Sequence, residues 1–197
     1  SKNGTVYKIA HSWASDNNLD SCNTFRRNIA KDLPGSVIYK DVNKLKIKNL
    51  PQIDAFTYGF PCNDYSVVGE RKGIKGVFGP LYTYGVSVLK ELKPKFFVAE
   101  NVGGIVSADD GKSFRKILSE LENCGNGYGL TVHRYKAEEY GVPQMRHRII
   151  IVGIDKKLNL KFKVPAPTSF NNPKSAREAI ETPPIPKNVA NNELTKQ

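Results

Sequence analysis

The chain has 197 residues, 39% of them hydrophobic and 25% charged, which suits one globular domain with a sizeable core and excludes a disordered chain. No apolar run approaches the length of a membrane span and no secretion signal opens the chain, so we expect a cytoplasmic protein. The formal charge of +11 at pH 7 favours a polyanionic partner, a weak indication because many basic proteins bind no nucleic acid.

Apolar runs rich in β-branched and aromatic residues predict six strands. In chain order these are Val6–Ala14, Ser36–Tyr39, Ile53–Tyr58, Lys95–Ala99, Leu130–Tyr135 and Arg148–Ile154. Apolar residues at helical spacing predict helices over residues 19–29, 81–92 and 114–121. Because strands and helices alternate, we predict an α/β fold with a doubly wound, mostly parallel sheet.

The composition changes at Pro165. Six of the 12 prolines follow from there, among Asn, Thr and Lys residues. We therefore assign residues 1–164 to the main domain and residues 165–197 to a proline-rich linker or tail, with at most a short helix at Ser175–Ile180.

Three cysteines, Cys22, Cys62 and Cys124, are widely spaced and form no C-x-x-C pair. This pattern supports neither a disulfide framework nor a zinc site, and we expect no metal. Because their number is odd, at least one thiol must be free. We assign Cys22 and Cys124 to structure only.

Ligands of doubly wound sheets bind at the carboxyl ends of the strands, so residues just after each predicted strand are candidates for a functional site. This rule selects Asp16, Asp41, residues 59–66, Glu100 and Asn101. Each carboxylate also has a structural explanation. Either aspartate is as readily a helix N-cap or a turn former, and Glu100 alone would more simply cap a loop or pair with a basic residue.

The segment Gly59-Phe60-Pro61-Cys62 places a thiol where a ligand would bind. Taken alone, such a cysteine is more often a small buried apolar residue than a nucleophile. Gln144, Arg146 and Arg148 stand at alternate positions beside the last predicted strand, so they share a face and could bind a phosphate or a carbonyl. A solvated strand edge is the better explanation of an isolated Arg-x-Arg.

Taken together and in this order, Pro61-Cys62, Glu100-Asn101-Val102 and the Gln-x-Arg-x-Arg segment resemble the motif series of the carbon-5 cytosine DNA methyltransferases of restriction-modification systems and phages. The resemblance covers roughly residues 13–165. It implies the Rossmann-like fold of S-adenosylmethionine-dependent methyltransferases and methyl transfer to cytosine in double-stranded DNA.

By this resemblance, Cys62 would add to carbon 6 of a cytosine flipped out of the duplex, and Glu100 would hold its ring nitrogen and exocyclic amine. Asn101 would brace the loop and Arg148 would reach the cytosine carbonyl oxygen. Arg146 would steady the Cys62 loop. The residues assigned to the substrate are Pro61, Ser66 and Gln144.

The resemblance also implies a site for S-adenosylmethionine. Asp16 would take the ribose hydroxyls of this cofactor, and Asp41 would accept from its adenine amine. Its other contacts would come from Asn17, Val42, Phe60 and Leu81.

Two parts of the family pattern are absent: a glycine-rich loop before Val6, and the target recognition region beyond the proline-rich tail. We therefore expect a partial catalytic domain, incomplete at its N-terminus, that needs missing segments or a partner chain and exposes a strand edge prone to dimer contacts or poor solubility. The alternatives are a non-catalytic or partner-dependent methyltransferase-like DNA-binding module, and an RNA cytosine methyltransferase.

Overall fold

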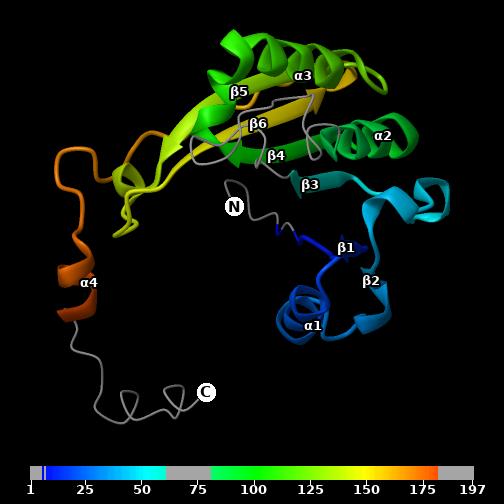
Figure 1. Cartoon of the computed structure of the whole chain (residues 1–197), viewed down its shortest axis with the longest axis horizontal. Coiled ribbons are helices and arrows are strands. Elements are labelled where there is room, and N and C mark those ends of the chain that lie inside the picture. Colours follow the sequence, from blue (N-terminus) through cyan, green and yellow to red (C-terminus); the bar gives the residue numbers. More distant parts are fainter. Residues whose placement is uncertain (1–5, 7, 61–80, 182–197) are drawn as a thin grey trace.

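The computed structural model describes residue 6 and residues 8–60 and 81–181. Its strands are β1 (Ala14–Asp16), β2 (Val37–Tyr39), β3 (Ala55–Gly59), β4 (Phe96–Val102), β5 (Tyr128–Lys136) and β6 (His147–Asp155). Its α-helices are α1 (Leu19–Asn28), α2 (Tyr82–Leu92), α3 (Lys112–Asn123) and α4 (Ala176–Glu181). Strands and helices alternate along most of the described chain, so the predicted α/β class is confirmed (Figure 1).

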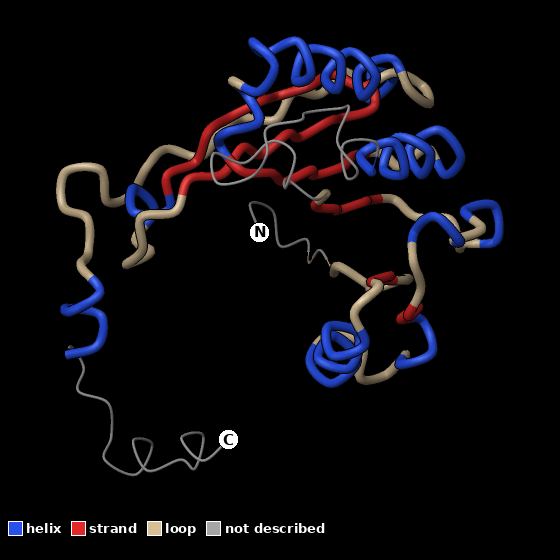
Figure 2. Tube along the Cα trace, in the orientation of Figure 1, coloured by secondary structure: helices blue, strands red, loops and turns tan. Residues whose placement is uncertain are grey.

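The described strands form two sheets, which Figure 2 shows as separate groups. One consists of β1 and β2, which are parallel. The other has the order β3-β4-β6-β5, in which β3 and β4 are parallel and β6 is antiparallel to both of its neighbours. Because β6 runs backwards, its first residues meet the carboxyl end of β4.

The main core lies between the four-stranded sheet and two helices. Phe97 and Ala99 of β4 and Ile151 of β6 pack with Leu89 of α2 and Ile117 of α3, and none of the five is more than 1% exposed. Each large side chain buried in this way stabilises the fold by about 1.5–3 kcal/mol. Since successive strand residues point to opposite faces, Glu100 must point away from this core.

The helices follow from local sequence. In α3, Phe114, Ile117 and Leu121 are buried at a spacing of three and four residues, which is the pattern of an amphipathic helix. The side chain of Asn18 accepts a hydrogen bond from the Ser21 amide at 2.9 Å and thereby caps α1. The short helix predicted in the tail is also present, as α4.

The strand prediction for Val6–Ala14 is wrong for most of its length. β1 begins only at Ala14 and pairs with the three residues of β2. Val6 and Ile9 are 88% and 97% exposed. A strand persists only where a neighbour accepts its backbone hydrogen bonds, and residues 8–13 have no such neighbour in the part of the chain that the structure describes.

Gly153→Ala is expected to lower the free energy of unfolding by about 2–3 kcal/mol, because an added methyl group would overlap the buried ring of Phe97. Gly129→Ala is a matched control on the paired strand β5, since its nearest neighbour, the carbonyl oxygen of Ile154, would be 3.7 Å from the new carbon. Urea unfolding of both variants measures the difference. Equal losses would show that the Phe97 ring has room to move.

Candidate functional site

Glu100 and Arg148 meet at the carboxyl end of β4. Arg148 lies opposite Val102 in the antiparallel ladder, and its Nε is 2.7 Å from Oε1 of Glu100. The Arg148 side chain is 25% exposed and that of Glu100 is 43% exposed. Gly59, opposite Glu100 in β3, leaves space for this carboxylate, because a side chain there would begin 3.4 Å from Glu100 Oε2.

The contact between these two side chains is an ion pair without a well-directed hydrogen bond. Arg148 Nε is buried, yet it has no hydrogen-bond partner among the described residues. The Nη1 group of Arg148 instead donates to the carbonyl of His147 at 2.8 Å. A buried donor without a well-directed acceptor costs roughly 1–3 kcal/mol, and the charge of Glu100 at 2.7 Å offsets part of that cost.

Asn101 lies on the core side of the same strand end and is 3% exposed. Its Nδ2 donates to the carbonyl oxygen of Phe60 at 3.2 Å, and its Oδ1 accepts from the amide of Val102 at 2.8 Å. Asn101 therefore ties the end of β4 to the last described residue before the Pro61-Cys62 step. Pro61, Cys62 and Ser66 themselves lie outside the described residues.

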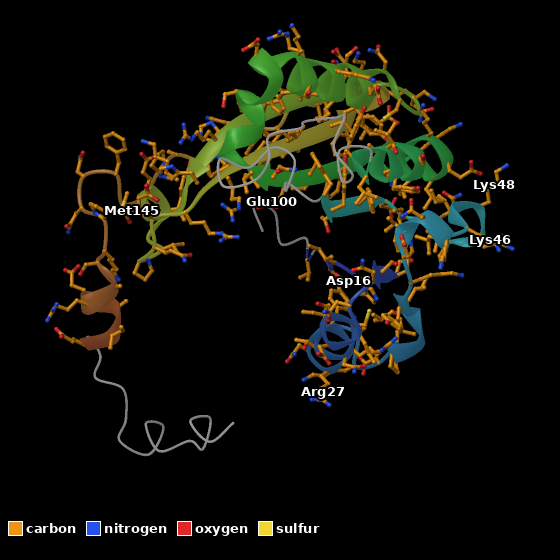
Figure 3. All side chains as sticks on the ribbon, viewed as in Figure 1. Asp16, Arg27, Lys46, Lys48, Glu100 and Met145 are labelled. Atoms are coloured by element: carbon orange, nitrogen blue, oxygen red, sulfur yellow. The ribbon has the colours of Figure 1, made fainter. Side chains whose placement is uncertain are left out.

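Gln144 and Arg146 are exposed on the turn that leads into β6. Neither side chain makes a hydrogen bond or an ion pair with Glu100 in the described part of the chain. Met145, between them, is 85% exposed and lies apart from Glu100 (Figure 3). The structure thus brings Arg148 to Glu100, whereas Gln144 and Arg146 stay exposed in the turn before β6.

The two aspartates predicted to bind a cofactor lie at the carboxyl edge of the small sheet. Asp16 ends β1 and its Oδ1 accepts from the Asn18 amide at 2.7 Å. Asp41 follows β2 and accepts from the amide and side chain of Asn43 at 2.9 and 2.8 Å. These bonds, the backbone one first, lower the pKa of Asp41 below its ordinary value. Both carboxylates therefore also act as turn formers or caps, which is the structural role that the sequence allowed as an alternative to cofactor binding.

The remaining predicted cofactor residues differ in exposure. Asn17 is exposed, and Val42 and Leu81 are half-buried. Phe60 is only 7% exposed and packs against the rings of Tyr58 and Tyr82 in the core, which leaves little of its surface for a ligand.

The lysines between β2 and β3 are solvent-exposed. Lys46 and Lys48 project from the edge of the molecule opposite Met145, away from Glu100 (Figure 3). The four lysines of this run, Lys40, Lys44, Lys46 and Lys48, thus form a solvated face.

Residues 3–196 match the family model for C-5 cytosine-specific DNA methylase. The chain belongs to this family. It is 52% identical to the Type II methyltransferase M.BbvI of Brevibacillus brevis over 98% of this chain and 52% of that protein. It is 36% identical to the Type II methyltransferase M.NgoFVII of Neisseria gonorrhoeae over 93% of this chain and 50% of that protein. The chain therefore spans about half the length of these relatives.

Solved structures agree with this methylase family. A putative DNA modification methyltransferase encoded within an E. coli prophage matches with a TM-score of 0.65 and 26% identity, over 86% of this chain and 47% of that one. The S. pombe Dnmt2 methyltransferase matches with a TM-score of 0.53 and 18% identity, over 92% of this chain and 50% of that one. At this lower identity the likeness shows the methyltransferase fold alone.

Among the described residues, no helix is both long enough and apolar enough to cross a membrane. The same residues contain no group of three or more His, Cys, Asp and Glu side chains that could hold a metal ion.

One set of polar contacts beside the motif residues of this chain was missed from sequence. His147, between Arg146 and Arg148, receives a hydrogen bond at Nδ1 from Arg134 at 3.1 Å, and its Nε2 lies 2.8 Å from Oε1 of Glu138. These partners stand nine and 13 residues earlier in the chain, and only the pairing of β5 with β6 brings them together. The sequence signal that could have pointed to these contacts was the position of a histidine between Arg146 and Arg148.

Glu138→Gln is expected to lower stability at neutral pH and to lose its effect in acid. The pKa of Glu138 is lowered, first by its own backbone amide and then by His147. A carboxyl with a lowered folded pKa stabilises fully above its ordinary pKa of 4.5, and this contribution is lost as pH falls through the lowered value. Urea midpoints of wild type and variant at pH 7 should therefore differ and should converge well below pH 4.5. A constant difference would contradict this assignment.

Proposed function

We propose that the protein carrying this chain transfers a methyl group from S-adenosylmethionine to carbon 5 of cytosine in DNA. The observation that carries the proposal is the Glu100–Arg148 pair, with its buried N–H, beside the strand end from which the Pro61-Cys62 loop departs. The description of the matching family, C-5 cytosine-specific DNA methylase, supports DNA as the substrate, and the Type II names of the relatives support a role in restriction-modification. We infer a cytoplasmic location from the same relatives.

The proposed reaction begins with Cys62. Its thiolate forms a bond to carbon 6 of a flipped cytosine, and the double-bond electrons move toward carbon 5 while Glu100 gives a proton to the ring nitrogen. Arg148 holds the carbonyl oxygen through its guanidinium group. Carbon 5 would then bond to the methyl group as the bond from that methyl group to the sulfonium sulfur breaks, and the thioether S-adenosylhomocysteine would leave. The ring nitrogen returns its proton to Glu100. Loss of the proton from carbon 5 to solvent restores the double bond and releases the Cys62 thiolate.

S-adenosylmethionine would supply the methyl group as an electrophile. The residues present fit this cofactor at two points. Asp16 is an exposed carboxylate at the end of β1, where ribose hydroxyls could donate to it. Asp41, two residues beyond β2, has a lowered pKa and stays ionised at neutral pH, so it can accept from an amine.

We further propose that a segment outside residues 1–197, or a partner chain, adds a strand between β1 and β3. In the described residues, β1 pairs only with β2 and β3 pairs only with β4, so each has an open edge. Three buried polar atoms on these neighbouring segments lack partners: Trp13 Nε1, Ser15 Oγ and Tyr58 Oη. The greater length of the relatives is consistent with such a segment.

The test is transfer of tritiated methyl groups from S-adenosylmethionine to duplex DNA and, in parallel, to transfer RNA. We expect the whole protein to label DNA at carbon 5 of cytosine, and the 197-residue chain alone to be inactive until the missing segment is supplied. Labelling of RNA only would establish the RNA methyltransferase instead. DNA binding without labelling of either nucleic acid would favour a non-catalytic module.

A further inference from the structure

His147 lies at the first position of β6, where the ladder with β5 ends. Its backbone partner there is Lys136, the last residue of β5. Beyond this pair, Arg146 is tied to its neighbour by a hydrogen bond from the amide of Ala137 to the Arg146 carbonyl, at 2.9 Å. Ladder ends fray readily because few bonds hold them. The direction of Arg146 and Arg148 thus depends on how firmly this last pair is held.

The side chain of His147 points to the face opposite that of Arg148, because adjacent strand residues alternate. On that face it is held between two charged groups from different elements. Arg134, in β5, approaches Nδ1 at 3.1 Å, and Glu138, in the turn after β5, approaches Nε2 at 2.8 Å. The His147 side chain is 31% exposed and that of Glu138 is 18% exposed, so solvent screens this set of contacts only in part.

The chemistry of the three groups defines one arrangement of protons. A guanidinium group can only donate, so Nδ1 of His147 must accept from Arg134. The hydrogen of a neutral imidazole is then on Nε2, from which it is donated to the Glu138 carboxylate. Both ring nitrogens of His147 then have a partner of the right kind, which gives the imidazole ring a single orientation.

Arg134 extends the contacts to the loop after the Glu100-Asn101 motif. A side chain at Gly103, which begins the turn after β4, would start 3.6 Å from Nε of Arg134. The guanidinium group therefore lies against the backbone of this glycine. One set of side chains thus links the ends of β4, β5 and β6, directly behind the Glu100–Arg148 pair.

We propose that His147 is a positioning residue for the methyl transfer reaction, which fixes Arg148 against Glu100 from the opposite face of the sheet by bridging Arg134 and Glu138. This inference rests on the proposed function for its effect on rate. It goes beyond that function because neither His147, Arg134 nor Glu138 is expected to touch the base or the cofactor.

The first test compares His147→Leu with His147→Gln. Glutamine can accept from Arg134 and donate to Glu138, whereas leucine can do neither. In the whole protein, we expect His147→Leu to lower kcat for DNA methylation about tenfold or more by misplacing Arg148. His147→Gln should restore most of this loss. His11→Leu, which removes a histidine hydrogen bond to Ser36 far from the site, serves as the matched control.

A second measurement does not depend on activity. In the 197-residue chain, the buried Nε–H of Arg148 should give a slowly exchanging nuclear magnetic resonance signal, identified by its loss in Arg148→Lys. This signal should broaden or vanish in His147→Leu and persist in His147→Gln and His11→Leu. An unchanged signal in His147→Leu, or equal loss in His147→Leu and His147→Gln, would overturn the proposal. A wild-type protein that keeps the signal but transfers no methyl group would instead refute the proposed function alone.

Discussion

Replacing Cys62 by serine is expected to abolish the covalent complex with DNA that contains 5-fluorocytosine. In the proposed reaction of the wild-type whole protein, attack by the Cys62 sulfur on carbon 6 and methylation of carbon 5 would leave fluorine where a proton is otherwise removed. The thiolate then cannot be expelled, and the protein stays bound to DNA. A serine hydroxyl is a far weaker nucleophile without an activating base, so no adduct should form. Mass spectrometry of the intact complex and of its peptides measures the result.

The other two cysteines provide the controls. Cys22 and Cys124 are each 1% exposed, and burial raises the pKa of Cys124 to about 11. A thiol with such a pKa is almost entirely protonated at neutral pH and is a poor nucleophile. Cys22→Ala and Cys124→Ala should therefore still form the adduct, after correction for any loss of stability. An adduct that survives in Cys62→Ser would place the nucleophile elsewhere.

The sequence predicted the regular elements well because their causes are local. The stripe of Phe114, Ile117 and Leu121 in α3 needs no knowledge of distant residues. The apolar runs of β3, β4, β5 and β6 also appear as predicted, within one to three residues at their ends. By contrast, the Val6–Ala14 prediction was wrong because a strand needs a neighbour as well as a suitable composition.

Part of the candidate site was predictable for a similar reason. Glu100 and Asn101 end a strong apolar strand, and the carboxyl end of a strand is where ligands bind in such sheets. The contacts that each of these two side chains makes were not predictable, because they depend on which strands are neighbours. These contacts are the 3.2 Å hydrogen bond from Asn101 to the Phe60 carbonyl and the ion pair of Glu100 with Arg148. Pairing of β6 with β4 is the non-local fact that joins two motifs 48 residues apart.

Another non-local pairing, that of β5 with β6, explains why His147 was not predicted. An alternating Gln-x-Arg-x-Arg pattern draws attention to the face that the arginines share and treats the residues between them as spacers. In the folded chain those spacers point to the other face, where His147 contacts Arg134 and Glu138. Residues that support a motif from behind are thus visible only once the neighbouring strand is known.

Glu100→Gln is expected to lower kcat for DNA methylation by about 10²- to 10⁴-fold, the range typical of a lost proton-transfer group. The amide keeps the shape of the side chain, but it cannot give a proton to the cytosine ring or form an ion pair with Arg148. Arg148→Lys keeps the positive charge and loses the planar donor group, so we expect a smaller fall of about tenfold. Single-turnover methylation rates at saturating DNA measure both effects separately from binding.

A matched control for these two variants lies at the other end of the same strands. Lys95, just before β4, forms a surface ion pair with Asp54, just before β3, at 2.8 Å, with both side chains mostly exposed. Asp54→Asn removes an acidic group of an ion pair just as Glu100→Gln does, at a site remote from the carboxyl ends. Solvent screens such exposed pairs almost completely, so stability and methylation rate should change little. If Asp54→Asn and Glu100→Gln slowed methylation equally, loss of charge on the sheet would explain the effect. If Glu100→Gln alone slowed it, the carboxyl of Glu100 would be acting on the reacting base.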